Sequence, residues 1–202
     1  SIKRSHVVVF VHGSSDSEAG WQVKPPRTSF GERLLLEFGA EPLYARYNSG
    51  LKVGQNGEGL CHLVAKLVKS NPAIRKLTFV AHSMGGLVVH SAIYQANLRR
   101  EPWTRKVKQV FLLGTPHRGA PLAKLVEKSE QVLQFIPNPI SLVAASVLNL
   151  RSGGLKDMTH GSAGLPAEGK ILLPKVKYVF VAGTVQKKAG GLLSRLVGDG
   201  MV

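Results

Sequence analysis

The chain has 202 residues, which is enough for one domain with a hydrophobic core of its own. Hydrophobic residues make up 44% of it and charged residues 19%, and no apolar run approaches the roughly 18 residues that a membrane-spanning helix needs. Its single cysteine, Cys61, excludes an internal disulfide framework and zinc sites built on several thiolates. No signal-like apolar stretch opens the chain, so the sequence leans towards a cytoplasmic location.

Basic residues dominate the charge of the chain. Its 27 Lys and Arg residues stand against 12 Asp and Glu residues, and the stretch from Lys170 to Arg195 holds six basic residues and no acidic one. Such a field attracts anionic surfaces over long range, although solvated faces account for most surface charge. No helix-turn-helix, zinc finger or aromatic-interleaved basic strand accompanies it, so we predict no nucleic-acid partner. Contact with an anionic membrane surface is the interaction that the charge favours.

Five runs rich in β-branched and aromatic residues predict strands. The first, residues 7–11, is continuously apolar, as a strand buried on both faces of a parallel sheet should be. The others occupy residues 43–47, 77–82, 107–113 and 175–182.

Helices are predicted between the first four of these strands. Ser29 and Glu32 have the spacing of a capping box that opens a helix, and Gly39 closes it. A loop is expected over residues 48–57, after which apolar residues recur at helical spacing over 60–68. This alternation predicts an α/β fold with a mostly parallel, doubly wound sheet, right-handed crossovers and helices on both faces.

Residues 122–169 interrupt the alternation within what we expect to be a single domain over 1–202. The segment holds Pro137, Pro139 and two apolar patches, and it is longer than an ordinary crossover. An inserted helical cap over the strand ends would explain it, and so would helices that merely cover the sheet.

The most specific signal is the junction at Ser83. A strand-like run meets this serine and continues as an apolar helix, which places the hydroxyl on a tight strand-to-helix turn. The residues two before and two after such a serine must be small, and Ala81 and Gly85 meet that need. We interpret Ser83 as a nucleophile on a nucleophile elbow, with an ordinary capping serine as the alternative.

Four motifs in order resemble the α/β-hydrolase family, and more narrowly its bacterial lipases and esterases and the related inositol deacylases of lipid anchors. Together they span nearly the whole chain, and the order makes the resemblance specific. They are Val11-His12-Gly13, Ala81-His82-Ser83-Met84-Gly85-Gly86, the run from Leu113 to Pro121, and Gly198-Asp199-Gly200-Met201-Val202.

The resemblance implies a serine hydrolase that cleaves a small-molecule or lipid carboxylic ester through an acyl-enzyme, with no cofactor and no metal. In this family pattern Ser83 is the nucleophile and Asp199 is the acid that orients a general-base histidine. The oxyanion hole would use the backbone N–H groups of Ser14, which follows the His-Gly pair, and of Met84.

The general base is missing from its expected place. The family order is serine, acid, histidine, yet all seven histidines precede Asp199. We therefore expect the chain to be incomplete at its C-terminus, with the catalytic histidine beyond Val202. His160, in the predicted cap, is the alternative base within the chain.

Other functions remain open at this point. An acyltransferase would use the same machinery with an acceptor other than water. A catalytically silent hydrolase-like module could bind a lipid or a protein through the basic surface. A metal-dependent hydrolase is disfavoured because the sequence holds no His-x-x-x-His pair and only three aspartates.

Overall fold

The computed structural model describes residues 2–14, 16–22, 28–116 and 172–182. The predictions for the cap at 122–169, for His160 and for Asp199 lie outside the described residues.

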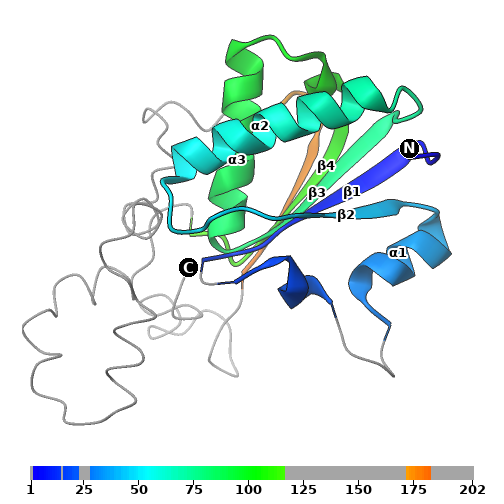
Figure 1. The fold of residues 1–202 in the computed structure, drawn as a ribbon, viewed down its shortest axis with the longest axis horizontal. Helices are drawn as coiled ribbons and strands as arrows, with labels where there is room; N and C mark the ends of the chain where they lie inside the picture. The colour runs from blue at the N-terminus through cyan, green and yellow to red at the C-terminus, as the bar shows by residue number, and fades with distance from the viewer. Residues whose placement is uncertain (1, 15, 23–27, 117–171, 183–202) are drawn as a thin grey trace, which may run out of the picture.

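The described residues form a five-stranded, wholly parallel sheet with the order β2-β1-β3-β4-β5 (Figure 1). The chain enters at β1, steps to the edge strand β2, and then crosses back to β3 and onwards. All five predicted strands are therefore confirmed, with shifted ends. Their bounds are β1 His6–Val11, β2 Glu41–Ala45, β3 Lys76–His82, β4 Val107–Leu113 and β5 Lys177–Val181.

Helices lie on both faces of this sheet, as a doubly wound topology requires. Because the step from β1 to β2 runs opposite to the later steps, right-handed crossovers put α1 on one face and α2 and α3 on the other (Figure 1). Their bounds are α1 Phe30–Phe38, α2 Val53–Ser70 and α3 Met84–Leu98, with short 3₁₀ helices η1 at Glu18–Trp21 and η2 at Pro102–Lys106.

Strand β1 explains why the first apolar run is continuous. Val7, Val9 and Val11 belong to the main core with α2 and α3, whereas Val8 and Phe10 point to the α1 face. All five are buried, so both faces of this strand need apolar side chains. Among the described residues, no helix is both long and apolar enough to cross a membrane.

Helix α1 begins and ends where the sequence predicts. Ser29 Oγ accepts from Glu32 N at 3.2 Å, and Ser29 N donates to Glu32 Oε2 at 2.8 Å, which completes the capping box. Gly39 closes the helix with φ 61°, a left-handed conformation that favours glycine.

The loop predicted over residues 48–57 is wrong in its second half, because α2 already begins at Val53. Gly57, which suggested a loop, serves close packing instead: a Cβ at this position would overlap the Ser91 side chain of α3. The Asn56 amide donates to Asn48 O at 2.9 Å and so ties the shortened loop to the helix. Strand β2 also ends earlier than predicted, at Ala45, and leaves Tyr47 in the loop.

Candidate functional site

Ser83 occupies a sharp turn between β3 and α3. Its φ of 51° and ψ of −126° lie in a backbone region that residues other than glycine rarely adopt. The turn is anchored on both sides, since Ser83 N donates to Leu113 O of β4 at 2.8 Å and Ser83 O accepts from Gly86 N at 3.0 Å. Such strain persists only where the surroundings fix it, and here the neighbouring strand and the first helical turn do so.

Small neighbours are needed around this turn for a steric reason. A Cβ on Gly85 would overlap the carbonyl oxygen of His12 and lie 2.6 Å from that of Val11, so α3 starts directly against the end of β1. Ala81 is fully buried, and its single methyl group fits. With any larger residue at position 85, the start of α3 could not lie this close to the end of β1 and the 12–14 loop.

The loop after β1 lies against the nucleophile candidate. A Cβ on Gly13 would sit 3.1 Å from Ser83 Cβ and 3.2 Å from His82 Nδ1. Ser14 follows directly and is half-buried, while Met84 is the buried first residue of α3. The N–H groups of a first helical turn have no intrahelical acceptor and carry the positive end of the helix dipole. The fold thus brings Ser83, Met84 and the 12–14 loop together at one end of the sheet.

The hydroxyl of Ser83 is shielded and has no hydrogen-bond partner among the described residues. The residue is 3% exposed. A buried hydroxyl without a partner is costly, by about 1–3 kcal/mol, so such a group calls for an explanation.

None of the five described histidines bonds to Ser83 Oγ. The ring of His6 bonds to Thr78 Oγ1, and burial, with Lys76 nearby, lowers the pKa of His6. The other four contact Tyr47 (His12), Arg99 (His62), Trp21 (His82) and Tyr178 (His90).

The predicted acid, Asp199, lies outside the described residues, and so does His160. Among the residues that are described, no group of three or more His, Cys, Asp and Glu side chains could hold a metal ion. Cys61 is buried in α2 and burial raises its thiol pKa, as expected of a small hydrophobic residue rather than a reactive thiolate.

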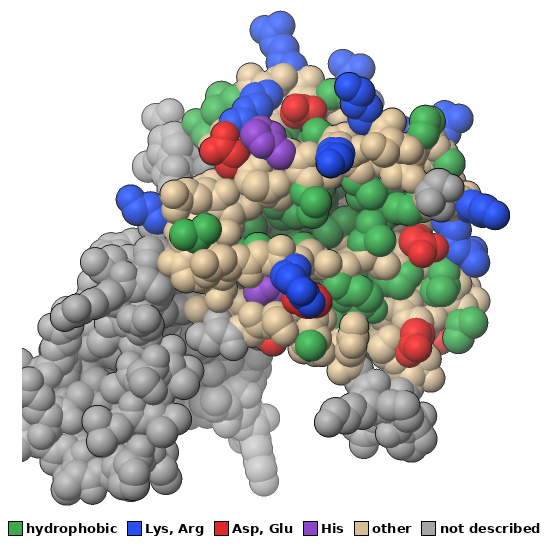
Figure 2. Space-filling view, viewed as in Figure 1, with side chains coloured by type: hydrophobic (Ala, Val, Ile, Leu, Met, Phe, Trp, Pro, Cys, Tyr) green, Lys and Arg blue, Asp and Glu red, His purple; other side chains and the backbone are tan. Residues whose placement is uncertain are grey.

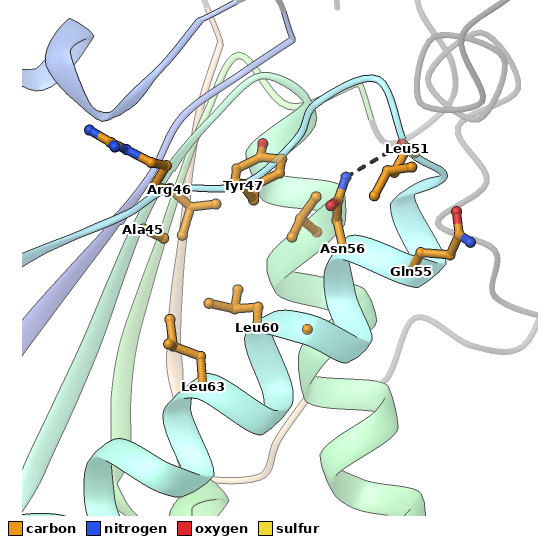
Figure 3. A pocket seen from close by; sticks show the side chains of 11 residues that line it. Ala45, Arg46, Tyr47, Leu51, Gln55, Asn56, Leu60 and Leu63 are labelled. Atoms are coloured by element: carbon orange, nitrogen blue, oxygen red, sulfur yellow. Dashed lines mark hydrogen bonds between the residues drawn. The ribbon is translucent and has the colours of Figure 1, made fainter.

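An apolar pocket of about 320 Å³ opens beside the first loop, between α2, α3 and the end of β2 (Figure 3). The pocket is lined by Val11, Leu60 and Val88, and Tyr47 lies at its upper end in Figure 3. A second hollow continues between α2 and β2 past Leu67. Figure 2 shows apolar side chains gathered in this region, with both basic and acidic side chains around them.

The sequence analysis missed two residues near the site. Tyr47 contacts His12 through both its ring and its hydroxyl. Thr115 is buried where a Cβ on Gly86 would overlap its hydroxyl. Thr115 belongs to the motif from Leu113 to Pro121, so the sequence offered a signal for it. For Tyr47 the sequence offered only its place at the end of a predicted strand.

The strand order, the parallel register and the strained strand-to-helix turn at Ser83 define an α/β-hydrolase fold. Solved structures of two hydrolases share it. The mature lipase BlEst2 of Bacillus licheniformis is 21% identical, with a TM-score of 0.69, over 100% of this chain and 78% of that one. The metagenomic carboxyl esterase MGS0156 is 18% identical, with a TM-score of 0.57, over 89% of this chain and 50% of that one.

Within this class, residues 1–147 match the family described as "Putative serine esterase (DUF676)", and the chain belongs to that family. Membership supports an esterase-like hydrolase function. No curated protein matches the chain.

Proposed function

We propose that this protein is a serine esterase that cleaves carboxylic esters with apolar acyl groups through an acyl-enzyme on Ser83. The observation that carries the proposal is the backbone of Ser83, held at φ 51° between a strand and a helix with the 12–14 loop packed against its Cβ. An ordinary capping serine has extended backbone angles and caps the helix with its side chain, whereas Ser83 makes no side-chain cap bond.

In the proposed reaction, Ser83 Oγ forms a bond to the ester carbonyl carbon while a histidine takes the hydroxyl proton. The histidine then returns that proton to the departing alcohol as the ester C–O bond breaks. Water repeats the sequence on the acyl-enzyme and releases the carboxylic acid. We propose that Asp199 orients the general-base histidine of this family pattern, and His160 is the candidate for that base within the given sequence.

Negative charge develops on the carbonyl oxygen in both steps. We propose that the N–H groups of Ser14 and Met84 stabilise it from two sides of Ser83. Removing one such donor typically costs about 3 kcal/mol of transition-state stabilisation, so their placement matters as much as that of the nucleophile.

The test is active-site labelling and ester hydrolysis by the full-length protein. Wild type should react with a fluorophosphonate and hydrolyse chromogenic esters, and Ser83→Ala should lose both. Ser70→Ala, at the exposed C-terminal end of α2, is the matched control and should behave as wild type. Labelling or hydrolysis by Ser83→Ala at the wild-type level would refute the assignment, and a folded wild type that never labels would favour the silent binding module.

An acyltransferase would label in the same way. It would be recognised by product analysis, since in the presence of an alcohol acceptor it would form a new ester rather than the free acid.

A further inference from the structure

We propose that Tyr47 is a positioning residue that fixes the Ser14 N–H towards the reacting carbonyl oxygen, acting through His12. This inference rests on the proposed function, because it assigns Ser14 to the oxyanion hole.

Tyr47 reaches His12 because β1 and β2 end together. The parallel register pairs Val11 with Ala45, so the loops that follow both strands leave the sheet side by side. The Tyr47 hydroxyl donates to the His12 carbonyl oxygen at 2.5 Å. The Tyr47 and His12 rings also stack, with centroids 4.2 Å apart and planes 14° apart. One side chain therefore holds both the backbone and the ring of His12.

The ring of His12 in turn holds the next peptide unit. His12 Nδ1 lies 2.9 Å from Gly13 O, and since a carbonyl oxygen only accepts, Nδ1 carries the hydrogen in this bond. The Gly13 carbonyl and the Ser14 N–H belong to one planar trans peptide and point in opposite directions. Fixing the direction of Gly13 O therefore fixes the direction of the Ser14 N–H.

The position of Tyr47 suits a permanent brace. Its side chain lies at the head of the apolar pocket, and its hydroxyl points away from the pocket (Figure 3). Burial, with a smaller effect of Asp16, raises the pKa of Tyr47 above its usual value, so the phenol stays protonated and can donate at any physiological pH. The His12 carbonyl oxygen that it holds is the atom that a Cβ added to Gly85 of α3 would meet most closely.

The experiment compares Tyr47→Phe, which removes only the hydroxyl, with Tyr47→Leu, which also removes the stacked ring. We expect kcat to fall about tenfold in the first and about a hundredfold in the second, with KM within twofold of wild type, because the loss is confined to the transition state. Tyr44→Phe is the matched control. Tyr44 lies on β2 and stacks on a residue of β1, Phe10. Among the described residues, its hydroxyl makes no hydrogen bond to the 12–14 loop. Its kcat should equal that of wild type.

A tetrahedral inhibitor separates positioning from a general loss of structure. The affinity of an alkylboronic acid, whose serine adduct carries an oxyanion, should fall in Tyr47→Phe by the same factor as kcat. Circular dichroism checks that the variants are folded. If Tyr47→Leu is not folded, Tyr47→Phe alone tests the proposal. If Tyr47→Phe keeps both kcat and boronate affinity within twofold while Ser83→Ala is inactive, the role of Tyr47 is wrong and the esterase assignment stands. If Ser83→Ala remains active, the proposed function fails and the role of Tyr47 fails with it.

Discussion

Replacing Gly85 by alanine probes the contact between α3 and the end of β1. In an exposed helix, glycine to alanine stabilises by up to about 1 kcal/mol. At Gly85 the new methyl group would overlap the His12 carbonyl oxygen and lie 2.6 Å and 3.0 Å from the carbonyl oxygen and carbon of Val11. These are backbone atoms of the last residue of a buried strand and of the residue that follows it, so they cannot swing aside as the end of a flexible side chain can. Overpacking typically costs about 1–3 kcal/mol, and backbone contacts lie at the upper end of that range.

The two effects subtract, so Gly85→Ala should lower the free energy of unfolding by about 2 kcal/mol, which is about 4–8 °C in Tm for a domain of this size. Relief of the overlap requires the first turn of α3 to move away from the 12–14 loop, and Ser83 and Met84 move with it. Misplacement of a reacting group by about 1 Å costs on the order of a hundredfold in rate, so kcat should fall by at least tenfold.

The assay is urea unfolding followed by circular dichroism, combined with ester hydrolysis. Gly59→Ala is the matched control, because Gly59 is an exposed glycine within α2 whose added Cβ would meet nothing within 4 Å. This control should be slightly more stable than wild type and equally active. If Gly85→Ala gains stability as Gly59→Ala does, or keeps full activity, the steric account of the turn is refuted.

Three further predictions concern stability. Ser29→Ala should lower the free energy of unfolding by about 1 kcal/mol in urea titrations through loss of the α1 cap, and an unchanged midpoint would contradict this. Because the pKa of His6 is lowered in the folded state, stability should decline as pH falls below about 6.5, and His6→Gln should flatten that decline; equal slopes would count against it. Because the pKa of Tyr47 is raised, wild type should lose stability as pH rises above about 10 more steeply than Tyr47→Phe in unfolding series, and parallel curves would refute this.

Local signals in the sequence were enough to predict much of the fold. The capping box of Ser29 and Glu32 and the left-handed Gly39 depend only on residues within one helix, and both are confirmed. The continuous apolar run of β1 indicates burial on two faces whatever lies on them. The junction at Ser83 was predictable for the same reason, since strand, turn and helix follow one another directly along the chain.

Signals that depend on distant partners were misleading or silent. The glycines before Leu60 suggested a loop, yet Gly57 lies within α2. A glycine is needed there because the Ser91 side chain of another helix, α3, leaves no room for a Cβ. Tyr47 looked like the last residue of a strand, and its role depends on the register that sets β2 beside β1. No pattern around residue 47 indicates which residue its hydroxyl will meet 35 positions away.

The same distinction separates the two sides of the candidate site. Ser83, Met84 and Gly85 are consecutive, so a change on this side disturbs the helix start and the proposed nucleophile together, and stability and activity should fall in parallel. The Ser14 side is held by a tertiary bond from Tyr47 to a loop that carries little of the core. Loss of that bond should reduce the rate much more than it reduces stability. We therefore expect Gly85→Ala to lower Tm and kcat together, and Tyr47→Phe to lower kcat with a much smaller change in Tm. A common relation between Tm and kcat for both variants would mean that the loop and the helix are not held independently.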